Sequence, residues 1–465
     1  MSEIQSDDNG PVESTPEDVE RADAVYSALL ARAGERWVQP RKERTARLLD
    51  YLGDPQRTYR VVHVTGTNGK TSTSRIIESL LRAHGLRTGL FTSPHLERFT
   101  ERIMIDGFPV PDAAVADAWD EMTPFVGLVD AELIEAGEEP LTFFELLTAL
   151  AFVAFADAPI DVLVLEVGMG GSWDSTNTAD GDVAVFAPIA LDHADRLGDT
   201  IAKIAEVKSG IIKDGAAVVS ARQPAEAVAV LRAAAAARGA TIAFEGEDFA
   251  LTSDRLAVGG QLISVRGLVG TYDDEYLPLY GVHQGANATL AIAAVESLIG
   301  GATQAIAGDI LADGLGAVTS PGRLQLVGTN PTVLVDAAHN PHGARALADA
   351  LRASFDFDEW GVVLGVLGDK DAAGIVAALA PIATEVFVTA PDSDRADSPD
   401  ALADIVEAAG LHASVHPNLD DAAESARAWA GESARRAVVI AGSVVLAGEA
   451  VALSSSEGWK SGGTS

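Results

Sequence analysis

The segment HVTGTNGKTST at 63–73 has the residue types and spacing of a phosphate-binding loop. It lies between an apolar run at 59–64 that predicts a strand and a pattern at 73–85 that predicts a helix. Glycines let the backbone turn so that its N–H groups face a phosphate, and the helix N-terminus adds partial positive charge. The residues expected to bind nucleotide phosphate or magnesium here are Gly66, Thr67, Asn68, Gly69, Lys70, Thr71 and Ser72.

Predicted strands alternate with predicted helices from Tyr59 onward. Val, Ile and Leu fill the strand-like runs without polar alternation, which is typical of parallel strands buried on both faces. Positions 241–280 predict short β-hairpins, and the Pro- and Gly-containing segment 316–327 predicts a linker, after which the alternation restarts. We therefore expect an α/β protein: a P-loop-containing parallel-sheet ATPase domain followed by a smaller Rossmann-like α/β domain.

The chain is thus expected to have four parts. They are a disordered acidic N-terminus at 1–20, an ATP-binding domain at 21–318, a C-terminal Rossmann-like domain at 319–453 and a flexible tail at 454–465. Two domains that meet at a linker create a cleft, which is a favoured place for a ligand.

The composition excludes several classes of function. Asp and Glu number 68 against 33 Lys and Arg, and this acidic balance repels nucleic acid and anionic membranes. There is no cysteine, which excludes disulfides, thiolate metal sites and cysteine nucleophiles. The first twenty residues lack the basic and apolar regions of a signal peptide, and no apolar run could span a bilayer. We expect a cytoplasmic protein without nucleic-acid or membrane partners.

The loop TGTNGKTS resembles that of the Mur ligase superfamily, whose members use ATP to join an amine to a carboxylate. Seven further stretches narrow the resemblance to the bifunctional dihydrofolate synthase and folylpolyglutamate synthase family. They are FTSPHLERFTERIMIDG (91–107), LEVGMGGSWDSTN (165–177), ALDHADRLGDT (190–200), IAEVKSGIIK (204–213), GVHQGANA (281–288), GRLQ (322–325) and DAAHNPHG (336–343). Thr71 departs from the family, which more often has glycine after the lysine.

The resemblance implies an ATP- and magnesium-dependent ligase. ATP would phosphorylate the carboxylate of a pterin-bearing acid, either dihydropteroate or a tetrahydrofolate polyglutamate. The amino group of L-glutamate would attack the acyl phosphate, so that ADP and phosphate are released. Because both steps move negative charge, catalysis should rest on positioning and on cations such as Lys70.

The resemblance also implies two magnesium sites. Ser93, Glu166 and His193 match the family's magnesium ligands, and each lies at or just past the end of a predicted parallel strand, where open α/β sheets bind ligands. Lys208 matches a lysine that is carbamylated in much of the family, and its carbamate would bind the second magnesium. Nearby cations lower the pKa of a lysine, which favours this reaction with carbon dioxide.

Four positions farther along the chain match family residues at the nucleotide and the domain cleft: Asn287, Arg323, Asp336 and His339. Arg323 follows the linker, so it would reach the phosphates only when the domains close. Asp336 could hold Arg323 or His339 in place, or help to orient glutamate. We assign catalytic roles to Lys70, Lys208, Asp336 and His339.

The stretch LTFFE, together with Asp174 and Ser175, resembles the pterin pocket of the bifunctional family members. Thr142 and Asp174 would hydrogen-bond the pterin ring, and Phe144 would form an apolar wall. The two phenylalanines of this stretch also begin an amphipathic helix, so they could instead belong to the core.

Two other functions remain open from the sequence. One is a Mur-type ligase with a murein peptide as acceptor, although murein ligases carry an extra domain before the loop and only about sixty residues precede it here. The other is a P-loop ATPase or switch that ligates nothing. We expect a monomer, because the two domains must move.

Overall fold

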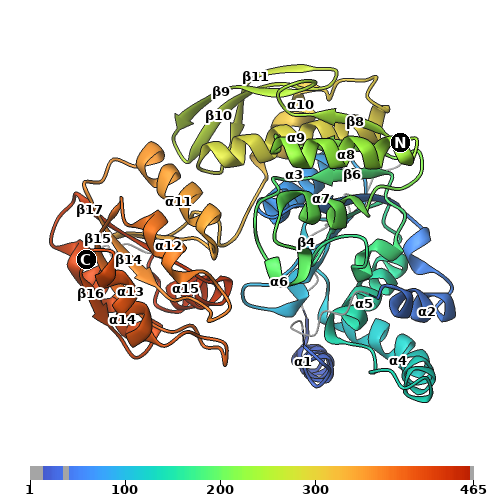
Figure 1. Ribbon diagram of the computed structural model, residues 1–465, viewed down its shortest axis with the longest axis horizontal. Coiled ribbons are helices and arrows are strands. Elements are labelled where there is room, and N and C mark those ends of the chain that lie inside the picture. The colour runs from blue at the N-terminus through green and yellow to red at the C-terminus, as the bar shows by residue number, and fades with distance from the viewer. Residues whose placement is uncertain (1–13, 35–40, 461–465) are drawn as a thin grey trace, which may run out of the picture.

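Two large β-sheets dominate the structure, one in each half of the chain, and Figure 1 shows them side by side. The computed structural model describes residues 14–34 and 41–460. The first half holds an eight-stranded and a three-stranded sheet, and the second half holds a six-stranded sheet. The chain crosses between them at 317–324, after helix α10 and before strand β12, within the predicted linker.

The eight-stranded sheet has the order β4-β3-β2-β5-β1-β6-β7-β8. Its strands are β1 (Arg60–Thr65), β2 (Thr88–Phe91), β3 (Ile103–Ile105), β4 (Phe108–Pro109), β5 (Val162–Glu166), β6 (Val183–Phe186), β7 (Ala217–Ser220) and β8 (Thr241–Phe244). All neighbours pair in parallel except at one edge, where β3 and β4 are antiparallel. The central position of β1 places the phosphate loop in the middle of the sheet's carboxyl edge.

Helices cover both faces of this sheet. Val62 and Val64 of β1 belong to the core shared with α3, α9 and α10, whereas Val61 belongs to the core shared with α1, α2, α4 and α5. The helices of this half are α1 (Pro16–Leu30), α2 (Glu43–Tyr51), α3 (Lys70–Ala83), α4 (Asp112–Glu135), α5 (Phe143–Asp157), α6 (Ala194–Leu197), α7 (Ile201–Ser209), α8 (Ala225–Ala237), α9 (Val282–Gly300) and α10 (Gly308–Gly316), with 3-10 turns η1 (Pro55–Arg57), η2 (Phe99–Arg102) and η3 (Ser175–Thr178).

The prediction of hairpins across 241–280 is right for one part and wrong for another. The strands β9 (Ala250–Ala257), β10 (Gly260–Arg266) and β11 (Thr271–Leu277) form an antiparallel meander over α9. Strand β8, however, pairs in parallel with β7 at the edge of the large sheet. It follows α8, so it completes a β–α–β unit and is not part of a hairpin.

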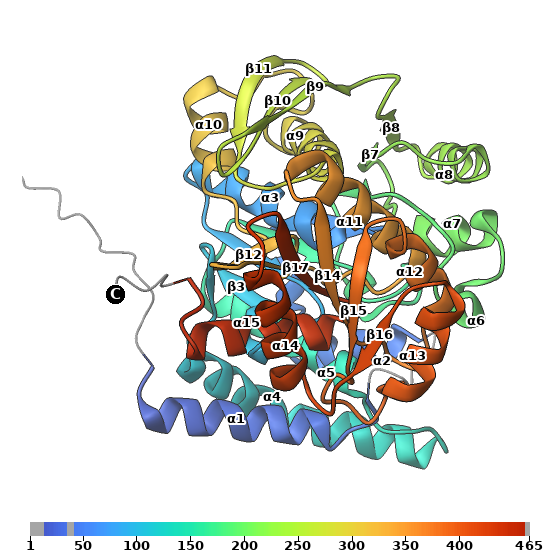
Figure 2. The same cartoon turned by 90° about the vertical axis from the view of Figure 1, so that its left-hand side faces the viewer.

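The second half has the strand order β12-β13-β17-β14-β15-β16, with only β12 antiparallel to its neighbour. Figure 2 looks onto this sheet and the helices around it. The strands are β12 (Gln325–Thr329), β13 (Thr332–Val335), β14 (Glu359–Leu364), β15 (Ala383–Val388), β16 (Ala413–Val415) and β17 (Arg436–Ala441). The helices are α11 (Pro341–Ser354), α12 (Ala372–Leu379), α13 (Pro399–Ala408), α14 (Leu419–Gly431) and α15 (Val444–Ser456). The predicted α/β fold with two sheet domains is confirmed.

The predicted disordered ends are wrong where the structure describes them. Helix α1 begins at Pro16, because Thr15 and Asp18 form a reciprocal capping box. At the other end α15 continues to Ser456, and Trp459 is buried beneath the guanidinium of Arg427. Residues 1–13 and 461–465 lie outside the described residues. No helix in the described ranges is both long and apolar enough to cross a membrane.

Candidate active site

A cavity of about 1310 Å³ lies between the two halves of the chain. Every residue that the sequence singled out lines it: the phosphate loop, the expected metal ligands, the expected pterin residues and the positions from the second half. They are Gly66, Thr67, Asn68, Gly69, Lys70, Thr71, Ser72, Ser93, Thr142, Phe144, Glu166, Asp174, Ser175, His193, Lys208, Asn287, Arg323, Asp336 and His339. Residues from most of the chain therefore meet in one cavity. It lies between the two domains, where a ligand-binding cleft was predicted.

The phosphate loop is a tight turn between β1 and α3. Gly69, the N-cap residue just before α3, has a φ of 82°, and a Cβ there would lie 2.6 Å from Asn287 Oδ1. A Cβ on Gly66 would lie 2.7 Å from the Cβ of Ala187, so both glycines are required by close approach as well as by the turn. Lys70 Nζ makes one hydrogen bond, to the carbonyl oxygen of Thr67 at 3.3 Å. An ammonium group has three donors, so Lys70 can still bind a phosphate.

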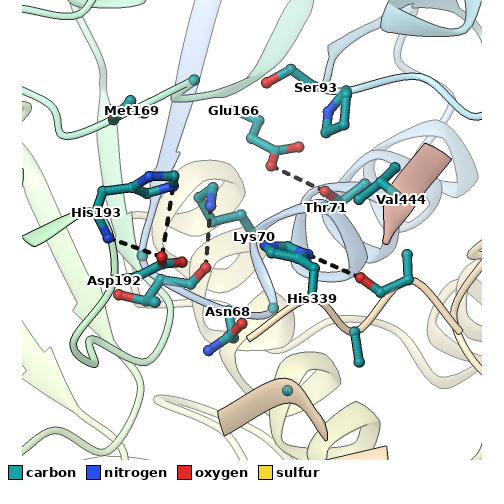
Figure 3. Close-up of a pocket in the computed structure, with 18 of the residues that line it drawn as sticks. Asn68, Lys70, Thr71, Ser93, Glu166, Met169, Asp192, His193, His339 and Val444 are labelled. Carbon is teal, nitrogen blue, oxygen red and sulfur yellow. Dashed lines mark hydrogen bonds and ion pairs between the residues drawn. The ribbon is translucent and has the colours of Figure 1, made fainter. Parts of the chain in front are cut away.

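Glu166 ends strand β5 beside the loop, as Figure 3 shows. Its Oε1 accepts a hydrogen bond from Thr71 Oγ1 at 3.0 Å, whereas its buried Oε2 has no hydrogen-bond partner in the described part of the chain. Burial raises the pKa of this carboxyl group, and the Lys70 ammonium opposes that rise. A buried carboxylate oxygen without a partner beside a phosphate loop fits a magnesium ligand, since Mg²⁺ prefers such oxygen ligands.

Ser93 and His193 contribute the other expected metal ligands. Ser93 follows strand β2, and His193 lies in the left-handed conformation (φ 48°) after β6. Burial lowers the pKa of His193, which favours the neutral imidazole that can bind a metal. Within the described ranges no three His, Cys, Asp or Glu side chains form a metal cluster by themselves. A magnesium ion here would therefore also need the Ser93 hydroxyl, water or phosphate oxygens.

Lys208 is buried at the end of α7, with its Nζ 2.8 Å from the carbonyl oxygen of Gly66. Burial, aided by the nearby Lys70 ammonium, lowers its pKa to about 7. A large share of the amine is consequently neutral near neutral pH. The hydrogen bond to Gly66 also ties α7 to the first residue of the phosphate loop.

Asp336 and His339 follow strand β13 on the opposite wall of the cavity. The carboxylate of Asp336 accepts hydrogen bonds from the backbone N–H groups of Leu324 and Ala338, both at 2.8 Å. It therefore shapes the backbone beside Arg323. Its pKa is raised by burial and pulled down by the charge of Arg323. Burial and the Lys370 ammonium lower the pKa of His339 to about 4, so this imidazole is neutral at physiological pH.

The expected pterin residues form a second group in the cavity lining, here called the pterin end, and the side chains of Thr142, Asp174 and Ser175 are already hydrogen-bonded. The Thr142 hydroxyl caps helix α5. Asp174 Oδ2 accepts from the backbone of Met169 at 2.9 Å, and Ser175 Oγ accepts from Thr45 Oγ1 at 3.1 Å. The ring of Phe144 lies so close to Gly168 that a Cβ there would be 2.4 Å from it.

The two phenylalanines that begin α5 were expected either to form the wall of a pterin pocket or to belong to the core. Phe143 is buried in the core of the first half, with 3% of its surface exposed. Phe144 is half-buried and lines the cavity. Phe143 therefore belongs to the core, whereas Phe144 packs against that core with part of its surface and lines the cavity with another.

Comparison with known proteins identifies the family. The Mur ligase middle domain matches residues 112–295, and the Mur ligase glutamate ligase domain matches residues 322–444. A dihydrofolate synthase/folylpolyglutamate synthase of Mycobacterium tuberculosis is 43% identical over 96% of this chain and 98% of its own length. The chain belongs to the dihydrofolate synthase/folylpolyglutamate synthase family. It is therefore an ATP-dependent acid–amino-acid ligase, as the resemblance predicted.

Solved structures of the family agree with this assignment. Folylpolyglutamate synthase of M. tuberculosis complexed with ADP is 44% identical, with a TM-score of 0.89 over 94% of this chain and 99% of that one. E. coli FolC in complex with DHPP and ADP is 28% identical, with a TM-score of 0.83 over 95% of this chain and 100% of that one. A folylpolyglutamate synthase of Lacticaseibacillus casei is 36% identical over 90% of this chain and 94% of its own length. The murein-type and ATPase alternatives are not favoured.

Sequence reasoning missed three polar residues here: Asp192 and Lys370, which line the cavity, and the buried Asn340, which bonds to the cavity residues Asn68 and Asp192. Asn340 Nδ2 lies 3.2 Å from Asn68 Oδ1 and 3.3 Å from Asp192 Oδ2, and Lys370 Nζ lies 4.0 Å from the other oxygen of Asp192. Asn340 and Lys370 come from the second half, so they join it directly to the phosphate loop and to the loop of His193. The sequence could have pointed to them: Asp192 and Asn340 are adjacent to the predicted site residues His193 and His339, and Lys370 follows the carboxyl end of a strand.

Proposed function

We propose that this ligase joins L-glutamate to two kinds of pterin-bearing acid, dihydropteroate and tetrahydrofolate polyglutamates. Relatives of similar length are named for both activities, and a related structure contains DHPP with ADP. The observation that carries the proposal is the single cavity, which is lined both by the phosphate loop and by Phe144 and Asp174. An acid bound with its pterin beside Phe144 and Asp174 would present its carboxylate to the phosphate loop.

The first step would be phosphoryl transfer to that carboxylate. An oxygen of the acid attacks the γ-phosphorus of ATP, and ADP leaves. Lys70 and the loop N–H groups would stabilise the charge that develops on the phosphate oxygens. Arg323 would add a second positive charge from the linker, and Asn287, which lies against Gly69, would contact the nucleotide.

The second step would form the amide. The amino group of glutamate attacks the carbonyl carbon of the acyl phosphate, the C–O bond to phosphate breaks, and the ammonium proton is lost. His339 is neutral and faces the cavity, so it would help to orient glutamate, while Asp336 keeps the Arg323 backbone in place. The chain is proposed to act as a monomer with L-glutamate, ATP and the acid as its small-molecule partners.

Two magnesium ions are proposed for the phosphate end. Ser93, Glu166 and His193 would hold the first, and the unpartnered Oε2 of Glu166 is the feature that fits it best. Magnesium supplies charge neutralisation for the transferring phosphate.

Lys208 is proposed to be carbamylated and to bind the second magnesium. Its neutral Nζ would attack carbon dioxide, forming an N–C bond and releasing one proton to leave a carbamate anion. The pKa of about 7 makes the neutral amine available, so the modification should form more readily at pH 8 than at pH 6. Intact mass should show the added group. An unmodified lysine with full activity in bicarbonate-free buffer would overturn this proposal.

The test of the ligase reaction is its dependence on each reactant. ADP formation is measured with MgATP, L-glutamate and dihydropteroate, and then with each of the three omitted in turn. The proposal predicts sustained ADP formation only in the complete mixture, together with a product heavier by one glutamyl residue; without glutamate the reaction should stop after a single turnover to the acyl phosphate. Sustained ADP formation without acid or without glutamate would instead indicate an uncoupled ATPase.

A further inference from the structure

The loop that carries Asp174 is held by side chains of strand β1. His63 and Thr65 point to the same face of the sheet, because side chains two residues apart on a strand do so. Thr65 Oγ1 donates a hydrogen bond to the carbonyl oxygen of Gly170 at 2.9 Å, and His63 Nε2 lies 3.0 Å from Thr176 Oγ1. Thr176 in turn donates to Asp174 Oδ1 at 2.5 Å. His63, Thr176 and Asp174 are thus linked by consecutive hydrogen bonds, and we call this chain the His63–Thr176–Asp174 relay.

The hydrogen bonds of the relay run in one direction. The Thr176 hydroxyl has one hydrogen, which it donates to the carboxylate, so its oxygen accepts the Nε2–H of His63. The other ring nitrogen, Nδ1, is buried without a partner among the described residues, which suits a bare acceptor better than an N–H. Burial lowers the pKa of His63 to about 3, so the ring stays neutral. His63 therefore acts as a fixed donor.

The relay determines the orientation of the Asp174 carboxylate. Oδ1 also accepts the backbone N–H of Thr176 at 3.0 Å, while Oδ2 accepts that of Met169 at 2.9 Å. These bonds occupy most of the roughly four lone-pair positions of a carboxylate. The carboxylate held in this way belongs to a residue that lines the cavity. His63 and Thr176 are both fully buried, at 0% exposure, so they cannot themselves touch a ligand.

We propose that His63 and Thr176 are positioning residues that aim the Asp174 carboxylate at the pterin ring and so set the affinity for the pterin acid. The inference rests on the proposed function, since it takes Asp174 as a pterin contact. The 2-amino-4-oxo edge of a pterin presents adjacent N–H donors, to which a fixed carboxylate is complementary. Strand β1 continues directly into the phosphate loop, and its side chains also hold the loop that carries Asp174. One strand therefore positions both the phosphate-binding residues and the proposed pterin contact.

The test is steady-state phosphate release by the full-length enzyme, with dihydropteroate and ATP varied separately. His63→Leu and Thr176→Val break the relay, whereas His63→Gln and Thr176→Ser keep a donor and a hydroxyl. Thr289→Val is the matched control, because this equally buried hydroxyl bonds only within its own helix, to Gly285. Thermal unfolding of each variant confirms that it folds cooperatively.

If the relay acts as proposed, KM for dihydropteroate should rise about tenfold in the two breaking variants. The loss of one hydrogen bond to a charged group weakens binding by about this factor. KM for ATP and kcat should stay within about twofold, and the conservative variants should restore KM. The double variant should match Thr176→Val alone, because both act through one carboxylate.

Two other outcomes overturn the inference in distinguishable ways. An unchanged KM for dihydropteroate in folded breaking variants, or equal rises in both KM values, would reduce His63 and Thr176 to structural residues while the proposed function stands. No turnover of dihydropteroate by the unsubstituted enzyme would remove the proposed function itself, and the role of the relay with it.

Discussion

The two ends of the cavity differ in how far their polar groups are already satisfied by the protein. At the phosphate end the buried Glu166 Oε2 has no partner within the described residues, and Lys70 makes one bond of 3.3 Å. At the pterin end the Asp174 carboxylate accepts from both Met169 and Thr176, and the Thr142 hydroxyl caps a helix. The first end keeps polar groups without protein partners, whereas the second uses most of its hydrogen-bonding capacity within its own fold and presents a carboxylate that is already held in place.

Because of this difference, substitutions at the two ends should affect catalytic activity and protein stability to different extents. A buried polar group without a partner is costly in the free protein, so a carboxylate oxygen of this kind beside a phosphate loop fits a ligand-binding role. A saturated group stabilises the loop or helix that it joins, whether or not a ligand is present. Substitutions at the phosphate end should therefore reduce the rate and leave the fold intact, and those at the pterin end should affect both.

The largest effect is expected for Lys70→Ala. Loss of the loop cation should lower kcat/KM on the order of 10³-fold, while the free energy of unfolding changes by less than about 1 kcal/mol. Phosphate release measures kcat/KM, and urea unfolding measures the free energy of unfolding. Lys203→Ala removes an exposed lysine of α7 and should change neither. A marked loss of stability in Lys70→Ala would break the comparison.

Asp174→Ala tests the saturated end. It leaves the buried N–H groups of Met169 and Thr176 without acceptors, at a cost of about 3 kcal/mol in unfolding free energy. KM for dihydropteroate should rise in the same variant. Asp174→Asn keeps one acceptor oxygen and should lose less stability. Wild-type stability in Asp174→Ala would show that the hydrogen bonds of this loop contribute little.

Glu166→Gln should reduce kcat on the order of 10²-fold without lowering stability. Burial already raises the pKa of this carboxyl group, so the neutral amide relieves the cost of a buried charge. Glu78→Gln is the matched control, because this equally buried glutamate accepts hydrogen bonds from Arg82 and Thr88 and should be destabilised by the change. Melting temperatures decide the outcome, and a drop for Glu166→Gln comparable to that of Glu78→Gln would contradict it.

The smallest effect is expected for Thr142→Ala. Removing the N-cap of α5 should lower the unfolding free energy by about 1 kcal/mol, and Thr142→Ser should restore it. Denaturant unfolding of the three proteins measures this difference. If alanine altered KM for dihydropteroate with no change in stability, Thr142 would belong with the open polar groups of the phosphate end.

Local patterns explain why much of the site could be predicted from sequence. The phosphate loop is contiguous, and its glycines, lysine and hydroxyls have a meaning that does not depend on the rest of the fold. Ser93, Glu166 and His193 could be placed together because the carboxyl ends of parallel strands share one edge. The roles of these residues remain predictions, whereas their meeting in one cavity is a property of the fold.

Other features depend on distances that the sequence does not contain. The contacts of Asn340 and Lys370 with Asp192 require the orientation of one domain on the other. A short strand such as β8 has the same alternation whether it pairs in parallel or in a hairpin, and only its neighbour β7 decides. The relay could not be predicted either, because His63 lies inside an apolar strand and its partner is far along the chain.

The most direct test of the account is phosphate release by the purified protein with MgATP and L-glutamate, and with either dihydropteroate or tetrahydrofolate as the acid. We predict turnover with both, because one cavity is lined by the phosphate loop and by the proposed pterin residues Phe144 and Asp174. Turnover with tetrahydrofolate alone would contradict the proposed use of dihydropteroate and leave a chain-extending ligase. Turnover with neither acid would contradict the proposed function.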